Sequence, residues 1–373
     1  EGVGYMSRAA FLMDKIMSRA GLEGRAFVAL LSSLACAIPG IMATRTLPSA
    51  KDRVATMLAA PLMTCSARLP VYVLLTSIMV PGDAKIGPLG ARGTVMFALY
   101  LLGAVSAMTA AWAVKQLTDR GHILLPFYME MPPYRMPRVR TVLIMVWDAC
   151  KGFLKKAGTI ITLTTVILWV LLNVPMRSDA QFDAFCASDK QCAAIAAAVD
   201  KPESSTVKGD DGQVITDAEE LGKLLDAQKT SYTMDNSWAA KGGKVVQPVF
   251  EPLGFEWRIN VAILSSLAAR ETFVATLGQI AAAEDPEDPG AHLATMTYQK
   301  DTLTNKAGDQ LFNPATVIAI LVFFVYALQC MATAGAMRRE TGTWKWPIIA
   351  FTYMFVMAWV MAALSRALVA AFM

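Results

Sequence analysis

Long apolar runs divide the chain into segments that match the thickness of a bilayer. Five runs reach the length needed to cross a hydrocarbon core of roughly 30 Å. They are Val54–Val80, Thr94–Val114, Ala157–Val174, Pro314–Met337 and Trp346–Met373. Two further stretches, Ala26–Thr44 and Ile259–Ala283, are apolar but interrupted. The pattern predicts an all-α integral membrane protein, a polytopic helical bundle with two broken elements.

Composition supports this fold class. Hydrophobic residues make up 55% of the chain and charged residues 17%, whereas soluble domains contain about 45–50% and about 25%. A lipid bilayer is therefore an expected partner of the chain.

The two broken elements resemble each other. GLEGRAFVALLSSLA (Gly21–Ala35) aligns without gaps to GFEWRINVAILSSLA (Gly254–Ala268), and ten of the fifteen positions are identical. A chance match between Leu/Ala/Ser-rich segments is the alternative. It does not explain the matched glycine, glutamate and arginine, so we expect a duplicated element.

The distribution of charge predicts the sidedness of these elements. Lys115–Gly158 holds eight basic and three acidic residues, and the short links Arg45–Arg53 and Arg338–Lys345 are also basic. The segments 176–256 and 283–313 are acidic. By the positive-inside rule the basic segments lie in the cytoplasm and the acidic ones outside. Each broken element then leaves on the side where it enters, and the two enter from opposite faces, as in transporters with inverted repeats. The alternative is that both cross normally and one loop is misplaced.

The expected organisation is two membrane repeats joined by a loop. The first repeat covers residues 1–175, the periplasmic loop 176–256 and the second repeat 257–373. The first contains gate 1 (26–46), spans 54–80 and 94–114, a cytoplasmic basic segment (115–156) with an interfacial amphipathic helix from Thr141 to Lys156, and span 157–174. The second contains gate 2 (259–278) and spans 314–337 and 346–373.

Three cysteines occur where apolar sequence is interrupted. Cys36 precedes Pro39 and Gly40 in LACAIPGIMATRT, and a proline deprives earlier carbonyls of their helical partners. Cys65 lies beside Ser66, between two prolines, and Cys330 lies beside Met331. Thiolates favour late first-row metals over Mg²⁺ or Ca²⁺, so a transition-ion site is plausible chemistry here. A small buried hydrophobe is the ordinary alternative for each cysteine.

Gate 2 places Arg270 and Glu271 inside apolar sequence, where charged residues are costly and indicate a functional site. A structural ion pair is the alternative. Hydroxyl groups in the two gates are candidate oxygen ligands for an ion. The alternative is that they form hydrogen bonds between helices. They include Thr44, Ser265 and Ser266.

Other patterns limit the chemistry of the chain. The two histidines, His122 and His292, fall outside the spans, which excludes an imidazole metal site and an HExxH protease. No G-x-x-x-x-G-K-[ST] run is present, so the chain does not hydrolyse a nucleotide by that route. Cys186 and Cys192 in the outer loop are expected to form a disulfide, with two unpaired thiols as the alternative.

Seven stretches of sequence are similar to one family. They are GYMSRAAFLMDKIM, CAIPGIMATRTL, DRVATMLAAPLMTCSARLPVYVLL, PFYMEMPPYRMP, FLKKAGTIITL, LSSLAARETFVATLG and MRRETGTWKWP. In this order, and over nearly all of the chain outside Met176–Pro252, the sequence strongly resembles the membrane domain of the bacterial ferrous iron transporter B family (FeoB).

The resemblance implies uptake of Fe²⁺ through a multi-pass protein of the bacterial inner membrane, without enzymatic activity in this chain. It implies gates at Ala26–Thr46 and Ile259–Gly278, with Cys36, Cys65 and Cys330 as the gate and span cysteines. The family carries a cytoplasmic GTPase domain before the GYM motif, which this sequence does not contain. We therefore expect a fragment or truncated product, with GTP and Mg²⁺ bound only by the missing domain. That domain, small accessory proteins and a homo-oligomer are expected as partners, and nucleic acid is not.

The expected mechanism takes Fe²⁺ from the acidic outer face to thiols and freed carbonyls where the gates converge. Glu271 offsets the loss of hydration of the ion, and Arg270 holds Glu271 in place. Two rivals remain at this point: a transporter of another solute (a nucleoside, a carboxylate or another divalent metal), and a membrane scaffold or receptor without flux. Neither rival explains thiols at the breaks.

Overall fold

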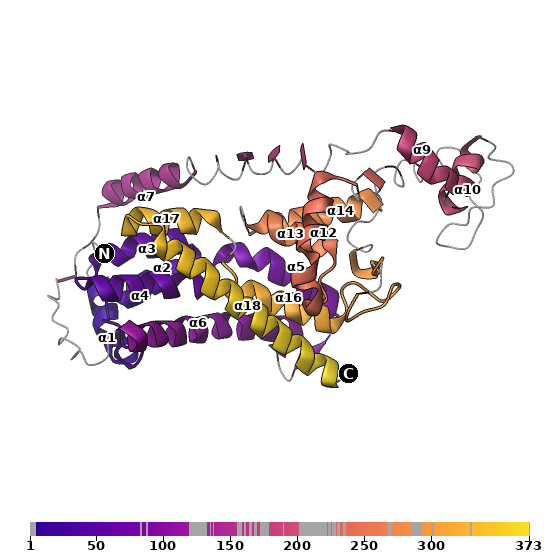
Figure 1. Cartoon of the computed structure of the whole chain (residues 1–373). Coiled ribbons are helices and arrows are strands. Elements are labelled where there is room, and N and C mark those ends of the chain that lie inside the picture. Colours follow the sequence, from indigo (N-terminus) through magenta and orange to yellow (C-terminus); the bar gives the residue numbers. More distant parts are fainter. Residues whose placement is uncertain are drawn as a thin grey trace. The chain divides into compact units, whose positions relative to one another are not determined.

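The computed structural model describes a chain made almost entirely of helices (Figure 1). The described residues are 5–82, 84–86, 89–118, 133–134, 136, 138–154, 159, 162–163, 166–167, 170–171, 179–188, 190–200, 222, 225, 229, 232–233, 236–267, 270–284, 293–299, 302–328 and 330–372. They fall into two compact units. Unit 1 combines 1–162, 266–271 and 313–373, and unit 2 combines 163–265 and 272–312.

Unit 1 combines helices from the N-terminal part of the chain with helices from its C-terminal part. Its elements are α1 (Tyr5–Arg19), α2 (Ala26–Ala35), α3 (Ala37–Ala43), η1 (Thr44–Thr46), α4 (Ala50–Ala59), η2 (Ala60–Leu62), η3 (Ser66–Arg68), α5 (Leu69–Met79), the two-stranded antiparallel hairpin β1 (Lys85–Ile86) and β2 (Leu89–Gly90), α6 (Ala91–Thr118), α7 (Val139–Phe153), α16 (Pro314–Tyr326), α17 (Met331–Thr341) and α18 (Lys345–Phe372).

Four stretches of unit 1 are long and apolar enough to cross a membrane. They are Ala50–Met79, Ala91–Leu117, Pro314–Thr341 and Lys345–Phe372. Each contains most of one predicted span, and together they confirm the predicted fold class, an all-α membrane protein. The fifth predicted span, 157–174, lies largely outside the described residues. Two shorter apolar helices, Ala26–Ala35 and Thr272–Ala281, belong to the predicted gates.

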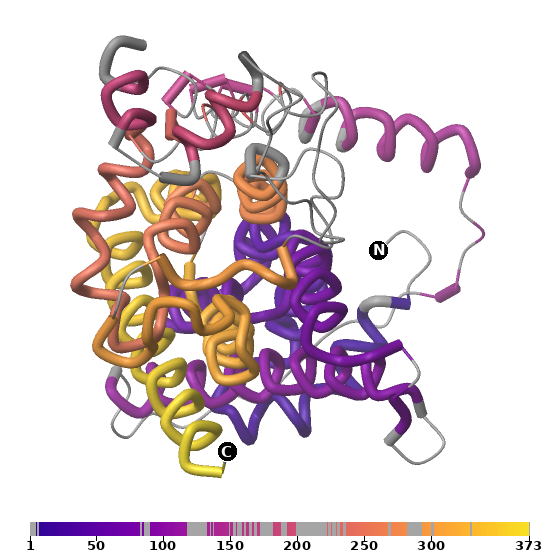
Figure 2. The backbone as a smooth tube through the Cα atoms, turned by 90° about the vertical axis from the view of Figure 1, so that its right-hand side faces the viewer, coloured from indigo at the N-terminus to yellow at the C-terminus, as the bar shows by residue number. Residues whose placement is uncertain are grey.

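Small residues allow the long helices of unit 1 to pack closely. α18 presents Ala350, Met354, Ala358 and Ala362, each fully buried, at every fourth position. Positions four apart share one face of a helix, and small residues let backbones approach within a membrane. α18 lies along α16 in both views, and α4 lies along α6 (Figures 1 and 2).

Helix α7 differs from these packed helices because its apolar side chains are uncovered. Leu143 is 63% exposed and Trp147 is 70% exposed. This segment was predicted as an interfacial helix over Thr141–Lys156. A helix whose apolar residues are exposed in the protein suits contact with lipid.

Unit 2 contains most of the predicted outer loop and the two helices of gate 2. Its elements are α9 (Asp179–Ser188), α10 (Lys190–Asp200), α12 (Trp238–Phe250), η6 (Glu251–Leu253), α13 (Trp257–Ser266, whose last residue belongs to unit 1) and α14 (Thr272–Glu284). The predicted loop is thus helical in its described parts.

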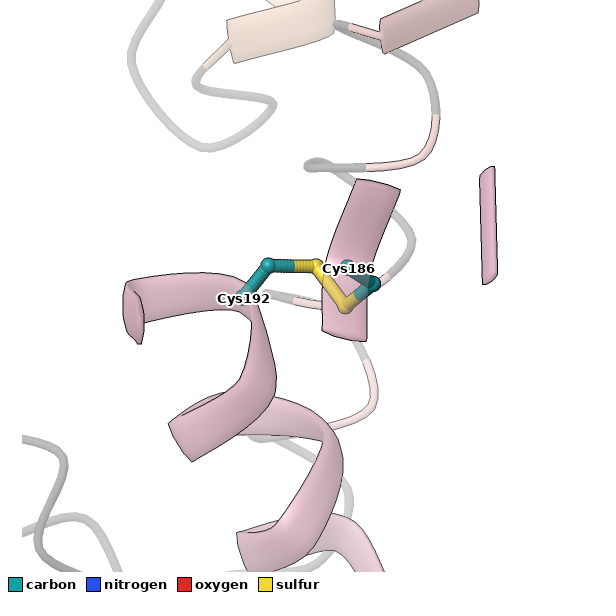
Figure 3. The surroundings of a disulfide bond; sticks show 2 residues. All are labelled: Cys186 and Cys192. Carbon is teal, nitrogen blue, oxygen red and sulfur yellow. A yellow bond between two sulfur atoms is a disulfide. The ribbon is translucent and has the colours of Figure 1, made fainter. Parts of the chain in front are cut away.

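A disulfide joins α9 to α10 (Figure 3). Cys186 and Cys192 have their Cα atoms 4.9 Å apart. Both cysteines are buried with Phe182, and Tyr232 packs against this small core. The bond that the sequence favoured therefore closes a hairpin of two short helices.

Candidate functional site

The first break lies in gate 1, at Cys36. α2 ends at Ala35, Cys36 is extended (φ −159°, ψ 137°), and α3 begins at Ala37. Pro39 was predicted to cause the break, but it lies in the first turn of α3. A proline is tolerated there because the N–H groups of a first turn have no partner within the helix. The break therefore precedes the proline and leaves Cys36 as the residue that connects the two helices.

Gly40 allows α3 to fold back against α2. A Cβ atom on Gly40 would lie 1.8 Å from the Ser33 hydroxyl oxygen and 2.7 Å from the carbonyl oxygen of Ala29. Any side chain at this position would collide with the other arm. α2 and α3 thus form a tight hairpin, whose C-terminal residue Thr44 is buried and donates to the carbonyl oxygen of Ile41 at 2.6 Å.

The second break interrupts the first long span. α4 passes into η2, the chain is extended at Cys65 (φ −88°, ψ 163°), and α5 follows η3. Arg68 holds this break together. Its guanidinium is completely buried and donates to the carbonyl oxygens of Pro61 (3.1 Å), Leu62 (3.3 Å) and Met63 (3.5 Å). This role of Arg68 was not predicted, although an arginine between two prolines in an apolar run was the signal for it.

The third break interrupts the span 314–341. α16 ends at Tyr326, Ala327 is extended, and Cys330 (φ −145°, ψ 102°) precedes α17. All three predicted metal-binding cysteines therefore lie at extended positions between helices, within unit 1. A buried cysteine that only fills space does not require such a position.

Hydrogen bonds link these breaks to the gates. The Ser66 hydroxyl donates to the carbonyl oxygen of Ala35 at 2.9 Å. In a continuous helix this carbonyl would accept from the N–H of residue 39, which proline lacks. The Met331 N–H donates to the carbonyl oxygen of Leu267 at 2.9 Å. In both places, the residue that follows a span cysteine donates to a carbonyl at the end of a gate helix.

Arg270 connects gate 2 to two of the breaks. Its side chain is 4% exposed, Nη1 donates to Cys65 Sγ at 3.4 Å, and Nη2 donates to the carbonyl oxygen of Ala327 at 3.3 Å. Glu271 was expected to pair with Arg270, but its side chain is exposed. The two described hydrogen bonds of Arg270 go to Cys65 and Ala327. Arg270 is thus buried while the next residue along the chain is exposed.

Of the three thiols, that of Cys65 is in contact with Arg270, and Cys36 and Cys330 lie at the other two breaks of unit 1. Among the described residues, however, no three His, Cys, Asp or Glu side chains come together as a complete metal site. The breaks offer soft sulfur donors and carbonyls freed at helix ends, without a closed coordination shell among the described residues.

The other predicted gate residues make local bonds. In unit 2 the Ser265 hydroxyl accepts from Thr276 Oγ1 and Thr272 Oγ1 donates to the Ser265 carbonyl oxygen, both at 2.8 Å, so hydroxyls join the arms of gate 2. Ser266 is buried, whereas Met331 is 56% exposed.

An ion pair closes the far end of gate 1. Arg45 Nε and Nη2 donate to the two carboxylate oxygens of Glu340 on α17, at 2.7 and 2.5 Å. The Glu340 carboxylate raises the pKa of Arg45 further above its ordinary value. The pair connects the two basic links that the charge pattern placed on the cytoplasmic side.

Comparisons with known proteins agree on one family. The family model described as nucleoside recognition (Gate) matches residues 1–79 and 154–344, and the model described as ferrous iron transport protein B C terminus matches residues 96–148. The chain belongs to the FeoB family. It is therefore a multi-pass protein of the inner (cytoplasmic) membrane, in agreement with its four apolar spans.

Individual FeoB relatives align along nearly the whole chain. The Fe(2+) transport protein A/Fe(2+) transporter FeoB fusion protein of Porphyromonas gingivalis is 36% identical over 98% of this chain and 40% of its own length. The Fe(2+) transporter FeoB of Leptospira interrogans is 33% identical over 96% of this chain and 45% of its own length. That of Methanocaldococcus jannaschii is 30% identical over 97% and 44%. The chain thus spans less than half the length of these relatives. No solved structure matches it.

Proposed function

We propose that the chain is the part of a ferrous iron transporter through which Fe²⁺ crosses the membrane. Curated relatives that match nearly all of the chain are named Fe(2+) transporters. The observation that carries the proposal for this chain is the position of Cys36, Cys65 and Cys330 at three helix breaks of one unit.

The chemistry of these positions suits a transported ion. Fe²⁺ is a first-row ion that accepts thiolate ligands, whereas Mg²⁺ and Ca²⁺ prefer oxygen. Conduction requires binding that is strong enough to admit an ion and weak enough to release it. Single thiols at three separate breaks, without a closed shell, satisfy both conditions. In this proposal Fe²⁺ passes from one thiol to the next, aided by carbonyls at the breaks.

Two finer parts of the proposal concern charge and control. The exposed carboxylate of Glu271 attracts the ion at the border of the thiol group, rather than serving as a buried ligand. A GTPase domain, bound on the cytoplasmic side, opens the path by acting on the basic links that Arg45 and Glu340 connect. GTP and Mg²⁺ belong to that domain and not to this chain.

Uptake of labelled Fe²⁺ under reducing conditions tests the proposal. The chain, joined to a GTPase domain of the family, is expressed in cells that lack other iron importers. We expect Cys65→Ser and Cys36→Ala to lose most uptake while the protein remains in the membrane. Cys150→Ser is the matched control, because Cys150 is an exposed thiol on α7. Equal uptake by all variants would remove the thiols from the path.

Another solute is the second candidate, because the matched family model is described as nucleoside recognition. In that case the thiols are dispensable, and Arg270 binds the solute directly. Uptake of labelled nucleoside that survives Cys65→Ser but not Arg270→Gln would favour it. Absence of flux of either compound would favour a scaffold or receptor.

A further inference from the structure

We propose that Arg270 is a tethered cation that occupies the donor atoms of the ion path when no metal ion is bound, so that metal binding and the Arg270 contacts exclude each other. The inference rests on the proposed function, because it takes Cys65 as a ligand of the transported ion.

The bonds of Arg270 are those that a metal ion would need. Its guanidinium contacts Cys65 Sγ and the carbonyl oxygen of Ala327, which come from two different helix breaks. One atom is a soft donor and the other is a backbone oxygen freed by the end of α16. No other described cation makes a hydrogen bond to either atom.

Charge makes the two states incompatible. Arg270 donates to Cys65 Sγ, and Arg68, three residues after Cys65, is a second buried guanidinium at the same break. A guanidinium is always charged, and like charges repel strongly where water is scarce. A divalent ion at Cys65 Sγ would therefore meet a permanent cation at hydrogen-bond distance, and Arg270 must leave before the ion can bind.

Arg270 is the cation that can leave. Arg68 is fixed by three carbonyl bonds within its own span. Arg270 makes one bond to each break, and its Nε is buried without a described hydrogen-bond partner. The preceding Leu267 is held separately, by its carbonyl bond from Met331. The side chain can thus swing away while the Leu267 carbonyl stays bonded to Met331.

This arrangement also explains how an ion would be released. When the Arg270 side chain returns, it restores its hydrogen bonds to Cys65 Sγ and to the carbonyl oxygen of Ala327. The gain of these two bonds favours departure of the ion. Arg270 therefore lowers the affinity of the path for metal, and a transporter with a lower affinity releases its cargo faster.

Co²⁺ binding to the purified full chain tests the proposal, since Co²⁺–thiolate absorption reports contact with sulfur. The variants are Arg270→Gln, Arg270→Lys and Arg270→Gln with Cys65→Ser. Arg366→Gln on α18 is the matched loss of another buried arginine. We expect Arg270→Gln to bind Co²⁺ about ten-fold more tightly than the wild type, roughly the value of one charge-assisted hydrogen bond. Arg270→Lys keeps the charge and changes the affinity less.

The outcomes separate the inference from the proposed function. Equal or weaker binding by Arg270→Gln, with binding that still requires Cys65, overturns the tethered cation and leaves Cys65 on the path. Binding that does not require Cys65 in any variant overturns both.

A second measurement needs no variant, in case Arg270→Gln fails to fold. In the wild-type chain, Co²⁺ should increase modification of Arg270 by phenylglyoxal, which mass spectrometry locates, because the displaced guanidinium is no longer buried against Cys65. Unchanged or decreased modification at saturating Co²⁺ contradicts the inference.

Discussion

The two copies of the repeated element share a local fold and differ in the group at the break. Each begins with a left-handed glycine at aligned positions, Gly21 (φ 74°) and Gly254 (φ 78°). Only glycine adopts this conformation without strain. Each copy then forms a ten-residue helix, α2 or α13, which ends within the shared LSSLA sequence.

The difference begins directly after the shared sequence. The first copy carries Cys36 at its break, next to Ala37, whereas the position aligned with Ala37 in the second copy is Arg270. In our proposal one copy offers a ligand to a metal ion, and the other offers a cation that occupies a ligand. The two copies share a ten-residue helix and differ in the charge of a few residues at the break.

The two broken spans also differ in the side chain that bonds to the carbonyls at their breaks. Carbonyls of the Cys65 break are held by Arg68 of the same span, and a carbonyl of the Cys330 break is held by Arg270 of a gate. The first break is therefore stable by itself, while the second depends on a side chain that we propose to be mobile.

The largest expected effect comes from removing the fixed arginine. Arg68→Met leaves three buried carbonyls without their donor, which costs on the order of 3 kcal/mol or more. We expect little folded protein, measured by size-exclusion chromatography and thermal unfolding in detergent. Arg270→Met, the matched change, should remain folded. Similar losses for both would remove the distinction between a fixed and a mobile arginine.

Gly40 provides a test of the tight hairpin. Gly40→Ala places a methyl group against Ser33 and Ala29, and we expect a loss of about 1–3 kcal/mol in the free energy of unfolding. Gly278→Ala in α14 is the control, because nothing lies within 4 Å of a Cβ atom there. The position aligned with Gly40 in the second copy is Phe273. If Gly278→Ala lowered the free energy of unfolding as much as Gly40→Ala, the loss would not be due to the close approach of α3 and α2.

Ser66 provides a smaller test of how a broken span is attached to its gate. Ser66→Ala removes the donor to the Ala35 carbonyl and should cost about 1 kcal/mol or less, since Ser66 is exposed. The second copy makes the corresponding contact with the Met331 N–H, which no side-chain substitution other than proline removes. Thermal unfolding of Ser66→Ala and Ser66→Thr measures the difference, and Ser66→Thr should retain the bond. No change in Ser66→Ala would mean that water replaces the hydroxyl.

The smallest expected effect depends on pH. Burial raises the pKa of Glu23 above 4.5, with further contributions from Asp52 and Asp14, although Arg25 opposes the shift. A carboxyl whose pKa is raised on folding binds its proton more tightly in the folded state, so stability falls as pH rises from 4.5 through the raised value. Unfolding of the wild type and Glu23→Gln across this range should differ in slope, and Glu23→Gln should be flatter. Parallel curves would contradict this assignment.

The sequence predicted elements better than it predicted partners. Hydropathy located four long apolar helices, and the duplication located two short helices that end in the same shared sequence, because these features depend on local order along the chain. Pro39 misled the prediction, since a proline suits a first helical turn as well as a break. The Arg270–Cys65 contact joins residues 205 positions apart. No periodicity indicates which donor meets which freed carbonyl, so Arg270 was assigned to its neighbour Glu271.

The role of Arg68 also could not be predicted from its position in the sequence. An arginine in an apolar run signals function or structure equally, and only its three carbonyl bonds decide for structure. The position of the three cysteines at helix breaks, by contrast, could be predicted, because each lies beside a helix-breaking or polar sequence.

Two contacts of unit 1 have a consequence for biogenesis. Arg45 meets Glu340, and the Tyr353 hydroxyl donates to the Leu58 carbonyl oxygen, each across 295 residues. Chains are synthesised from the N-terminus at about 5–20 residues per second. At that rate the first gate and its broken span wait on the order of fifteen seconds or more for these partners. Until these partners are synthesised, other contacts must shield the polar groups at the first breaks from lipid. We expect membrane-insertion factors, which hold unfinished helices, to provide those contacts.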